Sequence, residues 1–237
     1  KFAPTLYTNS HMSASMTNTI TLRRGYDIPL RGAVDSAAGI AEAPASVIAI
    51  CPEDYPGFVP KLLVREGEEV KCGTPIMRDK SREGLVLVSP APGRVRATVR
   101  GERRRIMRVE IETTSAPRGA VHVDRAASRQ EIVASLCASG LFAWLRQRPY
   151  DVVPDPEVTP RDIFITAFDT APLAPAPEVN QASAEALQAG IDLLGKLTDG
   201  SVYIGCRPGQ SLPTLNGATI VAFRGPHPAG NAGVQIN

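Results

Sequence analysis

Residues 67–98 constrain the fold of this chain more than any other stretch. Short apolar segments alternate there with turns that contain glycine, as at Gly73, Gly84 and Gly93. A strand of a few residues cannot bury much apolar surface alone, so several such strands must pair and close on one another. Many short strands at close spacing, each followed by a glycine turn, predict a small barrel or sandwich.

The order of these strands is similar to that of biotinyl and lipoyl domains, whose modified lysine lies at the tip of a tight hairpin. Lys80 follows Asp79 and precedes the next apolar stretch, as that lysine does. The turn here is the longer Lys80-Ser-Arg-Glu-Gly84, so Lys80 is not centred on it. A ligase that recognises the geometry of a hairpin tip should reject this loop. We therefore expect a fixed barrel, with a carrier of a covalent arm as the alternative.

The pattern changes to that of a βαβ unit beyond residue 160. Apolar strands are expected at 163–168, 202–206 and 219–223, and apolar residues over 178–197 recur at a helical period. A helix between two buried strands predicts a parallel sheet. The expected fold is therefore mixed, α+β and α/β: a small biotinyl/lipoyl-like β barrel-sandwich joined to a Rossmann-like parallel βαβ domain.

The expected segments follow from these patterns. They are a vector-derived or disordered leader over 1–15, a barrel domain with N-terminal strands over 16–120, a helical linker over 121–160 and a Rossmann-like domain over 161–237. The leader contains Ser10-His11-Met12, which looks like a cloning remnant. In the linker, Ser128 and Glu131 have the spacing of a capping box. A complete doubly wound sheet needs more strands, so we expect the last domain to be truncated at its C-terminus.

The composition of the sequence, and the motifs that it lacks, argue against several functions. A formal net charge of +2 does not support nucleic-acid binding. The four cysteines lie far apart, which disfavours iron–sulfur and structural zinc sites, and we expect no metal. No apolar run approaches the length of a membrane span. No triad, paired-carboxylate or HExxH motif is found, so we expect no catalytic residues.

Arginine is concentrated between residues 94 and 108. The residues are Arg94, Arg96, Arg100, Arg103, Arg104, Arg105 and Arg108. This pattern is typical of a solvated barrel face, or of a docking surface for an acidic partner or an anionic membrane rim.

Aromatic residues on expected loops and helix ends form the first candidate binding site. They are Tyr55, Phe58, Phe142, Trp144 and Tyr150, with Arg146 and Arg148 close to the last of them in sequence. Aromatic rings beside arginine suit a flat, apolar head group that carries carbonyl oxygens. Ordinary packing within or between domains is the alternative.

A proline- and glycine-rich loop after the last expected strand is the second candidate. It comprises Gly225, Pro226, His227, Pro228, Ala229 and Gly230. Glycines after a parallel strand can cradle phosphate, so a nucleotide- or flavin-binding module is one hypothesis. The spacing nevertheless matches neither GxGxxG nor a P-loop, because Asn231-Ala232 stand where lysine and a hydroxyl are needed. His227, fixed between two prolines, can hydrogen-bond a carbonyl or have a structural role.

These segments together resemble the A-subunit family of the bacterial Na⁺-translocating NADH:quinone oxidoreductases. The collinear stretches are 20–30, 79–80 with 89–93, 101–104, 139–150, 164–173 and 225–230, and the similarity extends from about residue 19 to the end. The related C subunit of Rnf-type complexes carries clustered cysteines, which are absent from this sequence. Two departures are the exit loop and helix at 171–197, which are short, and Cys51-Pro52 before Tyr55.

The resemblance implies a peripheral subunit on the cytoplasmic face of the bacterial inner membrane, in a complex that couples NADH:ubiquinone oxidoreduction to Na⁺ export. It implies other subunits, including membrane subunits, as partners, and ubiquinone as substrate of the complex, with no tightly bound cofactor in this subunit. The aromatic and arginine residues and His227 then become the expected quinone contacts. A non-catalytic scaffold of the same complex is the alternative, and the fragment alone is expected to be inactive.

Overall fold

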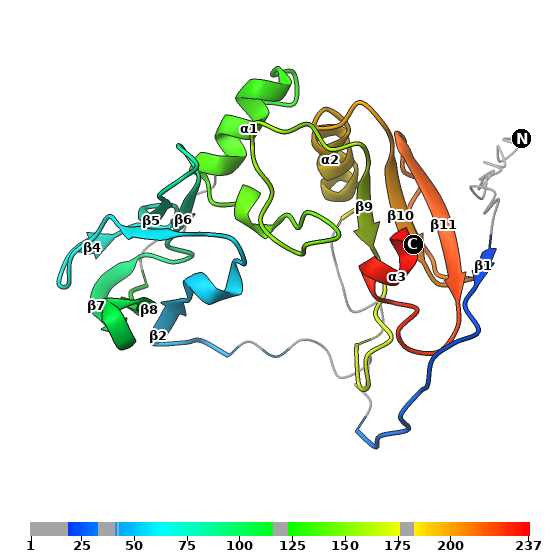
Figure 1. The fold of residues 1–237 in the computed structure, drawn as a ribbon, viewed down its shortest axis with the longest axis horizontal. Coiled ribbons are helices and arrows are strands. Elements are labelled where there is room, and N and C mark those ends of the chain that lie inside the picture. Colours follow the sequence, from blue (N-terminus) through cyan, green and yellow to red (C-terminus); the bar gives the residue numbers. More distant parts are fainter. Residues whose placement is uncertain (1–18, 33–40, 42, 116–122, 176–182) are drawn as a thin grey trace, which may run out of the picture. The chain divides into compact units, whose positions relative to one another are not determined.

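The computed structural model describes residues 19–32, 41, 43–115, 123–175 and 183–237. The expected leader over 1–15 lies outside these residues. The chain divides into two compact units. Unit 1 comprises Lys1–Ser36, Ile163–Ile191 and Ser201–Asn237, and unit 2 comprises Ala37–Asp162 and Asp192–Gly200. Both can be followed along the chain in Figure 1.

Unit 2 contains the predicted barrel-sandwich, built from two antiparallel sheets. One sheet has the order β2-β8-β7-β4, formed by Val47–Ile50, Ile106–Thr113, Gly93–Arg100 and Glu69–Val70. The other has the order β3-β5-β6, formed by Pro60–Leu62, Pro75–Asp79 and Val86–Val88. Apolar side chains that alternate along these strands fill the core, with Ile76, Val95 and Ile111 almost completely buried. The fold expected from the glycine-punctuated strands is confirmed (Figure 1).

Unit 2 also contains a helix and single turns of 3-10 helix between its strands and after them. Helix α1 spans Arg129–Ala138, and its N-terminus has the predicted capping box between Ser128 and Glu131. Single 3-10 turns form at η2 (Pro52–Asp54), η3 (Glu102–Arg104) and η4 (Phe142–Trp144). Ile132 of α1 and Phe142 of η4 are buried, so both segments pack through an apolar face.

Unit 1 is the predicted parallel sheet, with the order β1-β11-β10-β9. Its strands are Thr19–Thr21, Ala218–Arg224, Val202–Cys206 and Ile163–Thr166, and all neighbours run parallel. Helix α2 (Ala184–Gly195) connects β9 to β10, which confirms the βαβ unit. The first residues of the helix expected at 178–197 lie outside the described part of the chain. A short helix, α3 (Ala232–Ile236), follows β11.

The N-terminal strand does not belong to the barrel, where we expected it. Thr19–Thr21 instead pair in parallel with Ala222–Arg224 of β11, and Leu22 donates its amide to the Arg224 carbonyl at 2.7 Å. A three-residue strand is too short to specify its partner by its own pattern, because any free sheet edge of either unit offers the same hydrogen bonds. The other expected segment boundaries stay predictions.

Candidate functional site

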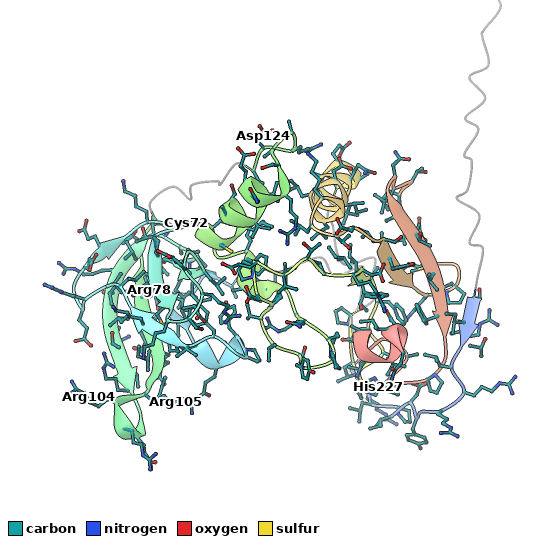
Figure 2. The ribbon with its side chains drawn as sticks, turned by 45° about the horizontal axis from the view of Figure 1, so that its top comes forward. Cys72, Arg78, Arg104, Arg105, Asp124 and His227 are labelled. Carbon is teal, nitrogen blue, oxygen red and sulfur yellow. The ribbon has the colours of Figure 1, made fainter. Side chains whose placement is uncertain are left out.

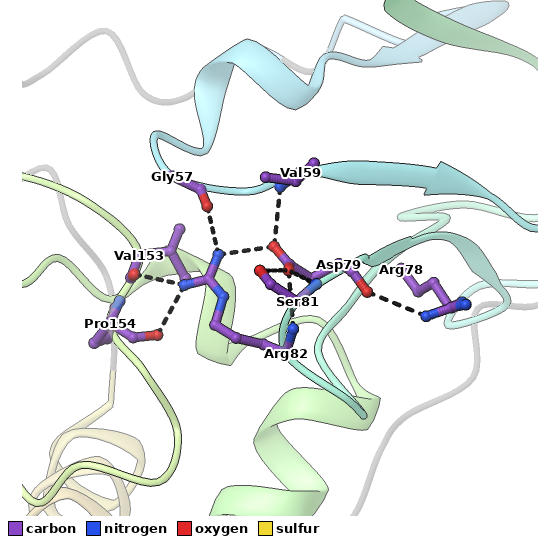
Figure 3. Close-up of polar contacts among 8 residues, drawn as sticks. All are labelled: Gly57, Val59, Arg78, Asp79, Ser81, Arg82, Val153 and Pro154. Carbon is purple, nitrogen blue, oxygen red and sulfur yellow. Dashed lines mark hydrogen bonds and ion pairs between the residues drawn. The ribbon is translucent and has the colours of Figure 1, made fainter.

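The loop that holds the modified lysine in a carrier is fixed here by a buried carboxylate (Figure 3). Asp79 ends β5 and its side chain is 0 % exposed. Its Oδ1 accepts hydrogen bonds from the Ser81 amide, the Ser81 hydroxyl and the Arg82 amide at 2.8, 2.7 and 3.0 Å. Its Oδ2 accepts from the Val59 amide at 3.0 Å and from Arg82 Nη2 at 2.8 Å. The carboxylate therefore closes the loop on itself and onto the segment before β3.

Arg82 extends this cluster to two further parts of unit 2. Its Nη2 donates to the Gly57 carbonyl at 2.7 Å, and its Nη1 donates to the carbonyls of Val153 and Pro154 at 2.7 and 3.2 Å. One guanidinium thus joins the loop after η2, the hairpin after β5 and the connector near residue 154 (Figure 3). We call Asp79, Ser81 and Arg82 the Asp79–Arg82 cluster.

The pKa of Asp79 shows how strongly this cluster favours the ionised form. Burial by itself raises the pKa of the carboxyl, but the hydrogen bonds from Arg82, Ser81 and Val59 outweigh it and lower the pKa to about 2. Asp79 is therefore an anion at neutral pH, and its charge is matched by the adjacent guanidinium at 2.8 Å.

Lys80 is exposed, but its backbone belongs to the same rigid loop. Its amide donates to the Val59 carbonyl at 2.9 Å, while the Asp79 amide donates to the Leu85 carbonyl at 2.9 Å. The lysine therefore lies beside a buried anchor and not on the centre of a free hairpin tip. This geometry supports a fixed barrel over a swinging-arm carrier.

The structure brings three of the expected aromatic-site residues together in unit 2. The rings of Tyr55 and Trp144 meet edge to face, with centroids 5.6 Å apart and an interplanar angle of 78°. Arg146 donates through Nη2 to the Asp54 carbonyl and through Nη1 to the Ala143 carbonyl, each at 2.8 Å. The guanidinium therefore holds η2 against η4, the two turns that present the rings. We call Tyr55, Trp144 and Arg146 the aromatic surface.

The remaining expected residues of this group divide between core and solvent. Phe58 and Phe142 are buried and belong to the packed core. Arg148 and Tyr150 lie in a turn closed by the bridge between Gln147 and Val152. Arg148 faces Asp151 at 3.5 Å within this turn, and Tyr150 is exposed. Trp144 is 68 % exposed, which makes its indole the largest open aromatic face of the aromatic surface.

His227 lies in unit 1, within the loop that follows β11 (Figure 2). Its amide donates to Asp27 Oδ1 at 2.8 Å, and its carbonyl accepts from the Tyr26 amide at 2.9 Å. Its Nδ1 lies 3.1 Å from Thr170 Oγ1, which also accepts the Gly230 amide at 2.9 Å. The Thr170 hydroxyl therefore links the His227 ring to the Gly230 backbone.

The glycines around this loop are required for close approach of two chain segments. A Cβ on Gly25 would collide with the His227 carbonyl oxygen, and a Cβ on Gly230 would lie 2.5 Å from the Thr170 amide nitrogen. Both positions are therefore filled by protein backbone. This packing, and not a phosphate cradle, accounts for the glycines at these two positions.

A pocket of about 500 Å³ lies in unit 1, at the carboxyl ends of the parallel strands. Its lining residues follow or end β1, β9, β10 and β11 in turn: Asp27; Phe168, Thr170 and Ala171; Arg207 and Pro208; Phe223, Arg224 and Gly225. Gly225 was expected at a site from its motif, whereas the charged residues were missed. They could have been found from their positions at or after the ends of expected strands, because side chains at the carboxyl ends of parallel strands converge at one edge of the sheet.

Within the described residues, no group of histidine, cysteine, aspartate or glutamate side chains has the arrangement of a metal site. The same residues contain no helix long and apolar enough to cross a membrane.

Comparison with known proteins identifies both parts of the chain. Residues 20–114 match the family model of the NqrA N-terminal barrel-sandwich hybrid domain, and residues 127–237 match that of the NqrA second alpha/beta domain.

Curated relatives are named as the A subunit of Na(+)-translocating NADH-quinone reductase. The relative from Photorhabdus laumondii is 40% identical over 230 residues, which cover 92% of this chain and 50% of the relative. That from Marinomonas sp. is 38% identical over 224 residues, covering 91% and 50%. The chain thus spans about half the length of the curated relatives it matches. With both of its domains matched in order, the chain belongs to the NqrA family, the A subunits of the Na(+)-translocating NADH-quinone reductases.

Proposed function

We propose that this chain acts within a peripheral subunit of a respiratory complex that couples NADH:ubiquinone oxidoreduction to Na⁺ export, on the cytoplasmic face of the bacterial inner membrane. The observation that carries the proposal is the collinear match of both domains to curated NqrA proteins at about 40% identity. The partners are then the other subunits of the complex, membrane subunits included. Ubiquinone is the substrate of the complex, and this chain holds no tightly bound cofactor of its own.

Within that complex, we place the quinone head group against the aromatic surface. Trp144 offers an open indole face for a flat ring, and Tyr55 orients the indole by its edge-to-face contact. Burial, followed by the nearby Asp54 carboxylate, raises the pKa of Tyr55. Its phenol therefore stays protonated at neutral pH and can donate to a quinone carbonyl. Arg146 already donates to backbone carbonyls, so it positions the two turns instead of contacting the quinone.

Fluorescence tests this placement directly, because Trp144 is the chain's one tryptophan. Titration with a short-chain ubiquinone should quench the emission along a saturating curve, after correction for absorption by the quinone. Tyr55→Phe keeps the aromatic ring and removes the donor, so it should shift the midpoint to higher quinone concentration by about threefold to tenfold.

A matched variant moves the reporter away from the proposed contact. Trp144→Phe combined with Tyr203→Trp places the indole on β10 in unit 1, where Tyr203 stacks on Phe164. Quenching of this variant should rise linearly with quinone concentration, as expected for collisions. Linear quenching of both proteins would contradict quinone binding at Trp144.

A scaffold role is the second candidate, supported by the tip of the β7–β8 hairpin (Figure 2). Arg103 and Arg104 adopt left-handed backbone conformations there, with φ of 52° and 62°, and both are exposed. Arg105 and Arg108 are paired with Glu53 at 2.9 Å and Glu110 at 2.8 Å. No ion pair among the described residues involves Arg103 or Arg104. The positive charges of these two residues at the tip are therefore not neutralised by a neighbouring carboxylate. Such a tip suits docking to an acidic surface.

A further inference from the structure

We propose that the pocket at the carboxyl ends of β1, β9, β10 and β11 binds an organic phosphate of mononucleotide size, through Arg207, Arg224 and Asp27. This site uses none of the residues of the aromatic surface. It goes beyond the quinone-associated role and does not depend on it.

The charges that line the pocket are the first reason. Arg207, Arg224 and Asp27 face the same hollow, yet none of them takes part in an ion pair among the residues that the structure describes. Two guanidinium groups and one carboxylate leave an excess of one positive charge. A cleft with such an excess concentrates anions, and guanidinium groups match the geometry of phosphate oxygens.

Arg207 is held in position before any ligand arrives. Its guanidinium lies 5.6 Å from the centre of the Phe168 ring, and its Nη2 donates to the Asp169 carbonyl at 2.5 Å. These contacts employ one face and one edge of a planar group that has five N–H donors. The other donors remain available to a ligand, and less side-chain entropy is lost when it binds.

The location and size of the pocket point to a ligand larger than inorganic phosphate. In open parallel sheets, ligands bind in the crevice beyond the carboxyl ends of the strands. The volume of about 500 Å³ falls within the range of roughly 300–1,000 Å³ that is usual for small-molecule sites. A phosphate ion alone would leave most of that space to water.

Asp27 determines which kind of organic group, attached to the phosphate, fits the pocket. Its Oδ1 accepts the His227 amide at 2.8 Å, and Oδ2 has no hydrogen-bond partner among the described residues. A carboxylate oxygen in a phosphate site repels a second anion but accepts hydrogen bonds from hydroxyl groups. The combination therefore selects a sugar phosphate, with the phosphate near the arginines and the hydroxyls near Asp27.

Isothermal titration calorimetry of the 237-residue chain tests this site with four probes: AMP, ribose 5-phosphate, adenosine and inorganic phosphate. AMP and ribose 5-phosphate should bind saturably and more tightly than inorganic phosphate, because they share the phosphate and the hydroxyls. Adenosine, which lacks the phosphate, should not bind. Equal binding of AMP and adenosine, AMP binding no tighter than inorganic phosphate, or no binding of AMP at millimolar concentration would overturn the proposal.

Variants then assign the binding to the named residues. Arg207→Gln and Arg224→Gln should each weaken AMP binding at least about tenfold, the effect of one charge-assisted hydrogen bond. Asp27→Asn should reduce the preference for AMP over inorganic phosphate. Circular dichroism at the titration temperature verifies that each variant is folded.

Arg24→Gln is the matched control, since Arg24 is an exposed arginine in the segment after β1 that does not line the pocket. It makes the same change of charge in the same unit and should leave AMP affinity within about twofold. If Arg24→Gln weakens binding as much as Arg207→Gln and Arg224→Gln do, the attraction is non-specific and the site is refuted.

Discussion

At the scale of single residues, Asp79 is expected to contribute strongly to stability, because its buried side chain anchors a whole loop. Asp79→Asn replaces one acceptor oxygen by a donor and leaves the Arg82 guanidinium, which is mostly buried, without its counter-charge. Removal of one partner from a buried ion pair destabilises proteins by roughly 3–5 kcal/mol. We expect a loss of about 3 kcal/mol in the free energy of unfolding, measured by urea titration with Trp144 emission as the probe.

The control for this variant is Asp151→Asn. Asp151 pairs with Arg148 at 3.5 Å, but both side chains are well exposed, and such surface pairs contribute about 0–1 kcal/mol. The pH dependence provides an independent check. The pKa of Asp79 is lowered from 3.8 to about 2 on folding, so its ionisation stabilises the native state above about pH 4 and this contribution is lost as the pH falls toward 2. The stability difference between wild type and Asp79→Asn should therefore shrink over that interval; a difference that is constant from about pH 6 to about pH 2.5 would contradict the assigned role.

The sequence pattern singled out Lys80, but the structural role of its neighbours Asp79 and Arg82 could not be predicted from it. Asp79 ends β5 and Arg82 follows three residues later in the loop, a spacing of acid and base that is common on any surface. What makes them a cluster is the set of backbone carbonyls at Gly57, Val153 and Pro154, contributed by distant segments. Every residue has such a carbonyl, so no residue type marks these acceptors in the sequence.

At the scale of secondary-structure elements, two glycines of unit 1 should respond oppositely to alanine. Gly230→Ala places a Cβ 2.5 Å from the Thr170 amide nitrogen, so the loop after β11 must move away from the segment after β9. We expect a loss of about 1–3 kcal/mol, typical of overpacking. Gly190→Ala lies inside α2 with open space around the new Cβ, so it should stabilise the helix by up to about 1 kcal/mol.

Thermal unfolding followed by circular dichroism measures both changes in the same protein. The melting temperature should fall for Gly230→Ala and rise for Gly190→Ala. A rise for both would show that the two segments near Thr170 are not tightly packed against each other.

Elements were predictable where their signals are local. The capping box at Ser128 and Glu131 marked the start of α1, and the continuous apolar run at 202–206 marked β10. The partner of β1 was not predictable, since it depends on which sheet edge lies nearby in space. The pocket residues Arg207 and Arg224 were overlooked for a related reason: each follows or ends an apolar strand, and only the parallel register brings them to one edge.

At the scale of the whole molecule, charge reversal at the hairpin tip separates the two proposed roles. Arg103→Glu with Arg104→Glu, introduced into the full-length protein in its host, should abolish co-purification with the membrane subunits if the tip is a docking surface. Quinone quenching of Trp144 in the isolated chain should remain unchanged, because the tip contributes no residue to the aromatic surface.

Lys61→Glu with Lys71→Glu is the matched control, since both lysines are exposed on the same barrel. This variant should assemble normally. Assembly of the arginine double variant at the wild-type level would refute the scaffold role of the tip. The resemblance to the family could be predicted from collinear motifs between about residue 19 and the end of the sequence, whereas the arginine-rich stretch could not show which of its charges are neutralised. That depends on Glu53 and Glu110, which approach through the fold.

The pairing of β1 with β11 bears on the order in which the molecule is made. A ribosome releases Thr19–Thr21 early, but their hydrogen-bonding partners at Ala222–Arg224 emerge only after the barrel and the other strands of the parallel sheet. The barrel, whose strands all lie between residues 47 and 113, can close in the meantime. During translation β1 therefore stays unpaired until β11 has emerged, and this pairing forms after the strands of the barrel are available. A slow step in biogenesis is expected at this closure, which joins the most distant segments and has the largest loop entropy to overcome.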